Sequence, residues 1–287
     1  MLDLVTIAPG ATRDGAHTGL GALPSASNGL DTTVLWIGCA LMFLGVLAFG
    51  YLRLTKATAT SRGFYDKSIL IVAAATCSYL AMALGVGSVH PVGIQTSSDL
   101  AHRILLPRYI DWSVTTPLLL LDVILFSKPL LNESWQWDAA LVVVFDVIMI
   151  VTGIVSGSIN GPARWFFFWA SVGAYAVVSA YVLTLFLKAG RITERLVAGK
   201  LRTLTGMLSV LWLIYPFVFA LYFGSVINGT TEDIAYAILD VLAKVGFGFV
   251  LLLGPAVELV DKTPSVAPKA DESARGASRG GRVGIAR

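Results

Sequence analysis

Charged residues are scarce in this sequence. Asp, Glu, Lys and Arg make up 14% of the 287 residues, whereas 56% of the residues are hydrophobic and the mean hydropathy is +0.76. A soluble domain of this length carries charge on about a quarter of its residues, because its surface must be hydrated. The composition therefore excludes a soluble domain and predicts an integral membrane protein.

Cysteine and net charge are also low. The two cysteines, Cys39 and Cys77, both fall in apolar segments, where we expect buried thiols. Two such residues exclude a disulfide framework. The formal net charge of +3 is small and spread over loops and tail, which argues against a nucleic-acid partner.

The two ends of the chain differ from the rest. Residues 1–30 lack a basic stretch followed by a long apolar core, so they do not resemble a cleaved signal peptide. Their Gly, Ser and Pro residues predict a mobile arm. Residues 262–287 are basic, polar and rich in small residues, which predicts a disordered tail. Residues 31–261 form the one expected domain.

Seven segments are long and apolar enough to cross a bilayer, which takes about 20 residues. They cover residues 32–54, 66–88, 104–127, 136–157, 164–188, 203–227 and 231–260. Residues 89–103, between the second and third spans, are long enough for a small hairpin or lid. The sequence thus predicts an all-α membrane protein, a bundle of seven transmembrane helices.

Lysine and arginine predict the orientation of this bundle. Basic residues cluster after the first and fifth spans and in the tail, while the loop after the sixth span has none. Basic loops stay in the cytoplasm. The amino terminus is therefore expected outside and the carboxyl terminus in the cytoplasm. Arg108 and Glu232 then lie toward the outside, and Asp122 lies toward the cytoplasm.

The third span carries polar residues on one face. Arg108, Asp111, Thr115 and Asp122, in RYIDWSVTTPLLLLDV, fall on one side of a helix of about 3.6 residues per turn. An ionised side chain at the bilayer centre costs at least about 2.5 kcal/mol. A single such aspartate is often structural, but three ionisable groups on one stripe favour a function. Asp111 and Asp122 are about 16 Å apart along the helix, so they would serve opposite sides of one site.

The seventh span contains Asp240 and Lys244 in LDVLAKVGFG. Their spacing of four places both side chains on the same helix face. A buried lysine must deprotonate, pair with an acid or be chemically modified. Two readings stay open on these grounds: a structural ion pair with Asp240, or a Schiff base between the lysine and an aldehyde.

These motifs, together with LWLIYPFVF in the sixth span, resemble those of the microbial rhodopsins, and specifically of the bacteriorhodopsin-like proton pumps. The resemblance covers all seven spans in order, and the tail favours the fungal or algal branch. It implies that the helix bundle encloses all-trans retinal. The retinal would be bound to Lys244 as a protonated Schiff base.

The resemblance also implies roles for the polar residues. Asp111 matches the primary proton acceptor, Asp240 the second counterion and Arg108 the gating arginine. Asp122 matches the cytoplasmic proton donor, and Ser68 matches the hydroxyl that partners this donor. Asp111 is expected to be ionised beside two cations. Asp122 is expected to be protonated, because it lies in a leucine-rich region with no cation close in sequence.

Further matches concern proton release and the retinal pocket. Glu232 matches one carboxylate of the release pair, whose usual partner is missing from the preceding loop FGSVING, so fast release is not expected. Tyr79 and Tyr215 would hold Asp240. The residues expected around retinal are Trp112, Thr116, Leu119, Met149, Gly153, Ser171, Trp212, Tyr215, Phe219 and Tyr79.

The resemblance predicts a light-driven outward proton pump, a transporter rather than an enzyme, in the plasma membrane. A slow photosensor that signals through a partner is the main alternative, but a sensor has no need of a donor such as Asp122. The helices lack the extra polar lining residues that a light-gated channel would need. A chloride pump would need a neutral residue at position 111, and a sodium pump would need amide side chains. A retinal-free transporter is a more distant alternative. The expected partners are protons and the lipid bilayer, with homo-oligomerisation left open.

Overall fold

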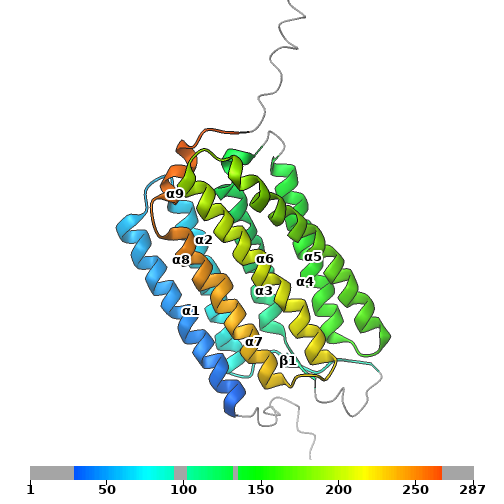
Figure 1. The fold of residues 1–287 in the computed structure, drawn as a ribbon. Coiled ribbons are helices and arrows are strands. Elements are labelled where there is room, and N and C mark those ends of the chain that lie inside the picture. Colours follow the sequence, from blue (N-terminus) through cyan, green and yellow to red (C-terminus); the bar gives the residue numbers. More distant parts are fainter. Residues whose placement is uncertain (1–28, 94–101, 132–134, 267–287) are drawn as a thin grey trace, which may run out of the picture.

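The structure is a computed structural model that describes residues 29–93, 102–131 and 135–266. The expected amino-terminal arm and most of the expected tail lie outside these residues. Figure 1 shows a bundle of long helices that run roughly parallel or antiparallel to one another. Of the described chain, seven helical segments are long and apolar enough to cross a membrane, so the seven expected spans are confirmed.

The long helices have the following bounds. They are α1 Gly29–Lys56, α2 Arg62–Ala83, α3 Leu106–Phe126, α4 Trp135–Ser158, α5 Pro162–Lys188, α6 Arg195–Phe223 and α7 Gly229–Val241. The seventh span continues from α7 through a π-helical segment, Leu242–Gly246, into α8, Phe247–Leu252. A short helix, α9 Ala256–Leu259, follows.

The helices form a closed ring. Each long helix packs against its neighbour in sequence, and α7 packs against α1. In addition, α3 contacts α6 across the bundle. A ring of this kind has an interior that lipid does not reach. Polar side chains are placed there at lower cost than toward lipid, because hydrocarbon offers them no partners.

Three span boundaries differ from the expected ones by five residues or more. One of them is the end of the seventh span, which lies at Leu252 rather than at residue 260. Helix α2 ends at Ala83 rather than near residue 88, because Gly85 and Gly87 follow with φ of +76°, a left-handed conformation that ends a helix. Helix α6 begins at Arg195 rather than at residue 203. Its start is set by Glu194, whose carboxylate accepts a hydrogen bond from the backbone N–H of Leu196 at 3.2 Å. The basic residues between 195 and 202 are thus helical.

The segment between α2 and α3 contains the expected hairpin. Strand β1, Ser88–Val89, pairs antiparallel with β2, Ile104–Leu105. The pairing lies at the end of the bundle where α3 and α7 begin (Figure 1). In the described part of this connection, Val92 also bridges to Ile159 beside the start of α5. This end of the bundle is therefore covered by backbone.

The outer surface of the bundle is apolar, unlike that of a soluble protein, and the interior contains charged side chains. Large apolar side chains such as Leu54, Trp137 and Phe166 are at least 70% exposed, while several charged side chains, among them Asp111 and Lys244, are buried. Such a surface suits lipid. The expectation of two buried thiols was half wrong: Cys39 is buried, but Cys77 is exposed on α2. An apolar sequence predicts burial in lipid as much as burial in protein.

Candidate functional site

Lys244 lies at the centre of the bundle, in the π-helical segment. Its Nζ is 2.6 Å from Oδ2 of Asp111 on α3 and 2.8 Å from Oδ1 of Asp240 on α7. All three side chains are at most 2% exposed. The spacing of four predicted the contact with Asp240, but only the fold brings Asp111 to the same nitrogen. Single π-helical turns occur often at functional sites.

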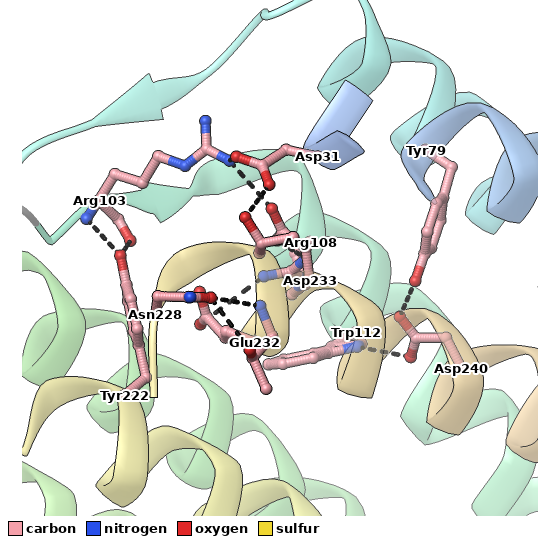
Figure 2. A network of polar contacts seen from close by, with 12 residues as sticks. Asp31, Tyr79, Arg103, Arg108, Trp112, Tyr222, Asn228, Glu232, Asp233 and Asp240 are labelled. Carbon is pink, nitrogen blue, oxygen red and sulfur yellow. Dashed lines mark hydrogen bonds and ion pairs between the residues drawn. The ribbon is translucent and has the colours of Figure 1, made fainter. Parts of the chain in front are cut away.

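Asp240 is held by four donors. Tyr79 donates from its hydroxyl at 2.8 Å, and Trp112 donates from Nε1 at 3.1 Å (Figure 2). Tyr215 donates from its hydroxyl at 2.9 Å. Lys244 is the fourth. Hydrogen bonds that end on a carboxylate stabilise its ionised form. Protonating Asp240 would weaken all four contacts, so this residue suits a permanent negative charge.

Asp111 is far less constrained. In the described chain its only side-chain hydrogen-bond donor is Lys244, and its Oδ1 has no partner. The hydroxyl of Thr115, on the next turn, donates to the backbone carbonyl of Asp111 at 2.9 Å rather than to the carboxylate. Asp111 therefore loses less than Asp240 when it takes up a proton.

A mostly apolar cavity extends from Lys244 between α3, α4, α5, α6 and α7. Nine of the expected retinal-pocket residues line it together with Lys244. They are Trp112, Thr116, Leu119, Met149, Gly153, Ser171, Trp212, Tyr215 and Phe219. Tyr79 does not line it, contrary to expectation. It comes from α2, on the far side of Asp240, where its ring packs against Gly38.

Several lining residues were not expected from the sequence. They are Tyr109, Ile150, Phe168, Val172, Tyr175, Pro216, Tyr236 and Ala243. Most lie one residue, or three to four residues, from an expected one, as Tyr236 does from Asp240 and Phe168 does from Ser171. Helical periodicity applied to each expected site residue would have found all of them except Val172.

Another buried carboxyl, Asp146 on α4, contacts Thr116, one of the residues that line this cavity. The hydroxyl of Thr116 is 2.8 Å from Oδ2 of Asp146 and also 2.8 Å from the backbone carbonyl of Trp112. A threonine hydroxyl has one hydrogen to donate. The hydrogen of Thr116 is therefore shared between the carboxyl of Asp146 and the backbone of α3, and Oδ1 of Asp146 has no hydrogen-bond partner among the described residues.

At the end of the bundle near the hairpin, Arg108 contacts two acids (Figure 2). It donates to Oδ1 of Asp233 at 2.7 Å and lies 3.8 Å from Oε1 of Glu232. Arg103 donates to the other oxygen of Asp233 at 2.9 Å, and lies 3.4 Å from Asp31. The sequence did not predict that Asp233 would contact Arg108 and Arg103. The position of Asp233 next to Glu232, at a helix start, was the available signal.

At the other end, Asp122 is fully buried and lies beside a cation. Lys67 Nζ, on α2, is 3.1 Å from its Oδ1. No cation lies close to Asp122 in sequence, as the sequence analysis noted, but the long side chain of Lys67 reaches it from another helix. Ser68 was expected to partner Asp122, but its buried Oγ has no hydrogen-bond partner among the described residues.

Seven helices able to cross a membrane form a ring, and the ring holds a buried lysine between two aspartates. These features define a multi-pass membrane protein with a charged centre. A family described as bacteriorhodopsin-like protein matches residues 29–256. This chain belongs to that family, the microbial rhodopsins. It is an integral membrane protein.

Relatives of known sequence or structure cover most of the chain. Archaerhodopsin-2 from Halobacterium sp. (strain aus-2) is 33% identical over 247 residues, which are 85% of this chain and 92% of that protein. The thermophilic rhodopsin from Rubrobacter xylanophilus superposes with a TM-score of 0.73 at 34% identity, covering 81% of this chain and 99% of that one. The light-driven proton pump rhodopsin from Coccomyxa subellipsoidea has a TM-score of 0.68 at 31% identity, with coverage of 78% and 96%.

Proposed function

We propose that this protein is a light-driven proton pump that moves protons outward and uses retinal bound to Lys244. The residues present suit such a group. Lys244 is a buried primary amine at one end of the cavity, and the cavity is lined mainly by aromatic and apolar side chains that suit a polyene. Retinal attached there would absorb visible light, and its change of shape would alter the proton affinity of the Lys244 nitrogen.

The observation that carries the proposal is the unequal bonding of the two aspartates. Lys244 Nζ contacts both, but Asp240 has three further donors and Asp111 has none. A proton that leaves Nζ therefore goes to Asp111, while Asp240 remains a carboxylate. This difference gives the transfer a direction, because neighbouring groups with different environments take different acid–base roles.

From Asp111 the outward path continues through Arg108. This guanidinium lies three residues before Asp111 in sequence and contacts Asp233 and Glu232 near the hairpin. When Asp111 becomes neutral, the attraction between its charge and Arg108 is lost, and Arg108 is freer to interact with the acids of α7. We assign this end to the outside, on the basis of the basic residues at the opposite end of the bundle.

The proton lost from Nζ is replaced from the other side by Asp122. This residue lies eleven positions after Asp111 on the same helix, about 16 Å further along the axis. Distance alone prevents it from serving the outward step. A carboxyl buried on the cytoplasmic side suits the return step, because water entering this half of the bundle would lower its proton affinity.

The test is illumination of unbuffered cells that express the protein and are supplied with retinal. Reversible acidification of the medium, abolished by a protonophore, is the expected result. Alkalinisation would reverse the proposed orientation or direction. No change of pH with a normal visible band would favour the sensor alternative.

Several wider assignments accompany this function. The chain acts as a transporter and not as an enzyme, in the plasma membrane, with residues 31–261 as the retinal-binding domain between an outer arm and a cytoplasmic tail. The slow photosensor is the second candidate. The buried Asp122 weighs against it, because a sensor gains nothing from a group that speeds recovery.

A further inference from the structure

Arg108 has acids on two sides along the bundle axis, and it pairs with those on the outer side. Its guanidinium donates to Oδ1 of Asp233 at 2.7 Å and lies 4.7 Å from the centre of the Tyr236 ring. Asp111 is one turn further along α3, yet no ion pair joins it to Arg108 in the described part of the chain. Asp233 lies about 10 Å before Asp240 along α7. The contact with Asp233 thus holds Arg108 away from the centre of the bundle.

Asp233 is itself fixed in place from the hairpin. Its Oδ2 accepts from the guanidinium of Arg103 at 2.9 Å, and its side chain is only 1% exposed. The hydroxyl of Tyr222 accepts from the backbone N–H of Arg103 at 2.8 Å and donates to its backbone carbonyl at 3.2 Å (Figure 2). The guanidinium of Arg103 also lies 3.4 Å from Asp31. Asp233 therefore offers Arg108 one oxygen in a fixed position.

Without this contact, the charges at the centre of the bundle would attract Arg108 inward. Two carboxyl groups, Asp111 and Asp240, face the single ammonium of Lys244. One cation does not neutralise two carboxylates, so a second cation nearby is attracted to them. Arg108 has a donor to spare, because its buried Nε has no hydrogen-bond partner among the described residues. The sequence predicted two cations beside Asp111, whereas in the described structure only Lys244 is within ion-pair distance of it.

We propose that Asp233 is a positioning residue for the proton acceptor: it holds Arg108 outward in the dark protein, so that Asp111 pairs with Lys244 alone. The inference rests on the proposed function, since it concerns the first proton transfer. An opposite charge beside a carboxyl favours its ionised form. With Arg108 held away, Asp111 has one such charge fewer and takes up the proton from Lys244 more readily. Asp233 acts on this transfer only through Arg108.

The first test is an acid titration of the retinal-bound protein in the dark, in which the visible band should shift to the red as Asp111 becomes neutral. Asp233→Asn removes the charge and keeps the shape, so Arg108 is free to move inward and stabilise the Asp111 carboxylate. The pH at the midpoint of the shift should then fall by about one unit, the low end of the effect of a neighbouring opposite charge. A midpoint that is unchanged or higher in Asp233→Asn would overturn the proposal.

Arg103→Gln separates this effect from a general disturbance of the outer end. It alters the same cluster, but it keeps the contact between Arg108 and Asp233 and frees Oδ2 for a bidentate one. Its midpoint should therefore not fall. An equal fall in Arg103→Gln and Asp233→Asn would attribute the effect to disruption of the hairpin end, and the proposal would be wrong. Asp233→Glu keeps the charge and should restore most of the wild-type midpoint. Asp66→Asn, at an exposed acid of the opposite end, should titrate like the wild type.

The other ionisable groups around Asp111 are the same in all of these variants. They are Tyr79 on α2, Asp146 on α4, Tyr215 on α6, and Glu232, Tyr236, Asp240 and Lys244 on the seventh span. A change of midpoint in Asp233→Asn therefore reports the position of Arg108.

The second test observes the contact itself, by solid-state NMR of unilluminated protein labelled at arginine side-chain nitrogens and aspartate side-chain carbons. The Arg108 signal is identified by its loss in Arg108→Gln, and the Asp233 signal by its loss in Asp233→Asn. A through-space cross-peak is expected between the Arg108 guanidinium and the Asp233 carboxyl carbon. A cross-peak between Arg108 and Asp111 in its place would overturn the proposal.

The outcomes for positioning and for pumping are separable. Both tests use unilluminated protein and need no transport. If cells fail to acidify the medium while the midpoint falls in Asp233→Asn and not in Arg103→Gln, the proposed function fails and the positioning role stands. If cells acidify the medium and Asp233→Asn titrates like the wild type, pumping stands and the positioning role fails.

Discussion

Arg108 donates to Asp233 at 2.7 Å but lies 3.8 Å from Glu232, although the two acids are adjacent in sequence. Asp233 also accepts from Arg103, so both of its oxygens face a guanidinium. Each oxygen of Asp233 thus accepts from an arginine, which makes this residue a poor hydrogen-bond partner for Glu232. The structure thus supplies a second acid near Glu232, but one that is already committed to arginine.

The first prediction concerns the timing of proton release. Because Asp233 is held by Arg103 and Arg108, we expect release late in the cycle in the wild type, and Glu232→Gln should change its timing little. A pH-indicator dye on the outer side measures this. If the dye reports release before uptake at neutral pH, the prediction is wrong. Asp233→Asn would then identify whether Asp233 is the missing partner.

The second prediction concerns Lys244. It is the only lysine among the described residues that line the cavity, so Lys244→Ala should abolish the visible absorption band formed with retinal. The matched control is Lys67→Ala, which removes a lysine outside the cavity and should keep the band. A covalently held chromophore in Lys244→Ala would refute the attachment site.

The third prediction concerns Asp111→Asn. Removing the anion beside the Lys244 nitrogen destabilises a localised positive charge there more than the delocalised charge of the excited chromophore. The visible band should therefore shift to the red, and light-driven acidification should stop. Asp66→Asn, which removes an exposed acid paired with Arg53, is the control and should leave both unchanged. Pumping at the wild-type rate in Asp111→Asn would exclude Asp111 as the acceptor.

The fourth prediction separates pump from sensor. In Asp122→Asn the proton for Lys244 must come directly from the cytoplasm, so recovery of the deprotonated state should slow and depend on bulk pH, while formation of that state stays fast. A small permeant acid such as azide should restore the rate, because it replaces the missing donor. Flash photolysis over a range of bulk pH measures this. Recovery that is equal in both proteins and independent of pH would favour the sensor.

Much of the fold follows from features that the sequence displays directly. Seven apolar segments must be helical in a bilayer, because helices satisfy their own backbone groups there. The spacing of Asp240 and Lys244 predicts their contact, since residues four apart share a helix face. Helix ends were less predictable. Glycines with positive φ shorten α2, and the Glu194 cap extends α6 beyond its apolar part.

The site was predictable where one helix sets the geometry, and less so where two helices meet. Arg108, Asp111 and Asp122 were found because they share one stripe of α3. The contact of Lys67 with Asp122 joins two helices, and the interaxial geometry that creates it has no local signal in sequence. The same holds for Arg103 and Asp233. Resemblance to relatives pointed instead to Ser68, one residue away from the lysine that lies beside Asp122.

Burial is distributed unevenly around the ring of helices. In the most apolar stretch of α3, 56% of the residues are buried, and in the seventh span 50% are, against 22% in α5. In a library of random variants, the tolerance to substitution should therefore differ from one helix to another. Exchanges among apolar residues on α5 mostly meet lipid, which adapts to a new shape, whereas exchanges on α3 leave voids or uncompensated charge. Natural sequence drift in this protein is then expected to accumulate on α5, while α3 and the seventh span change slowly.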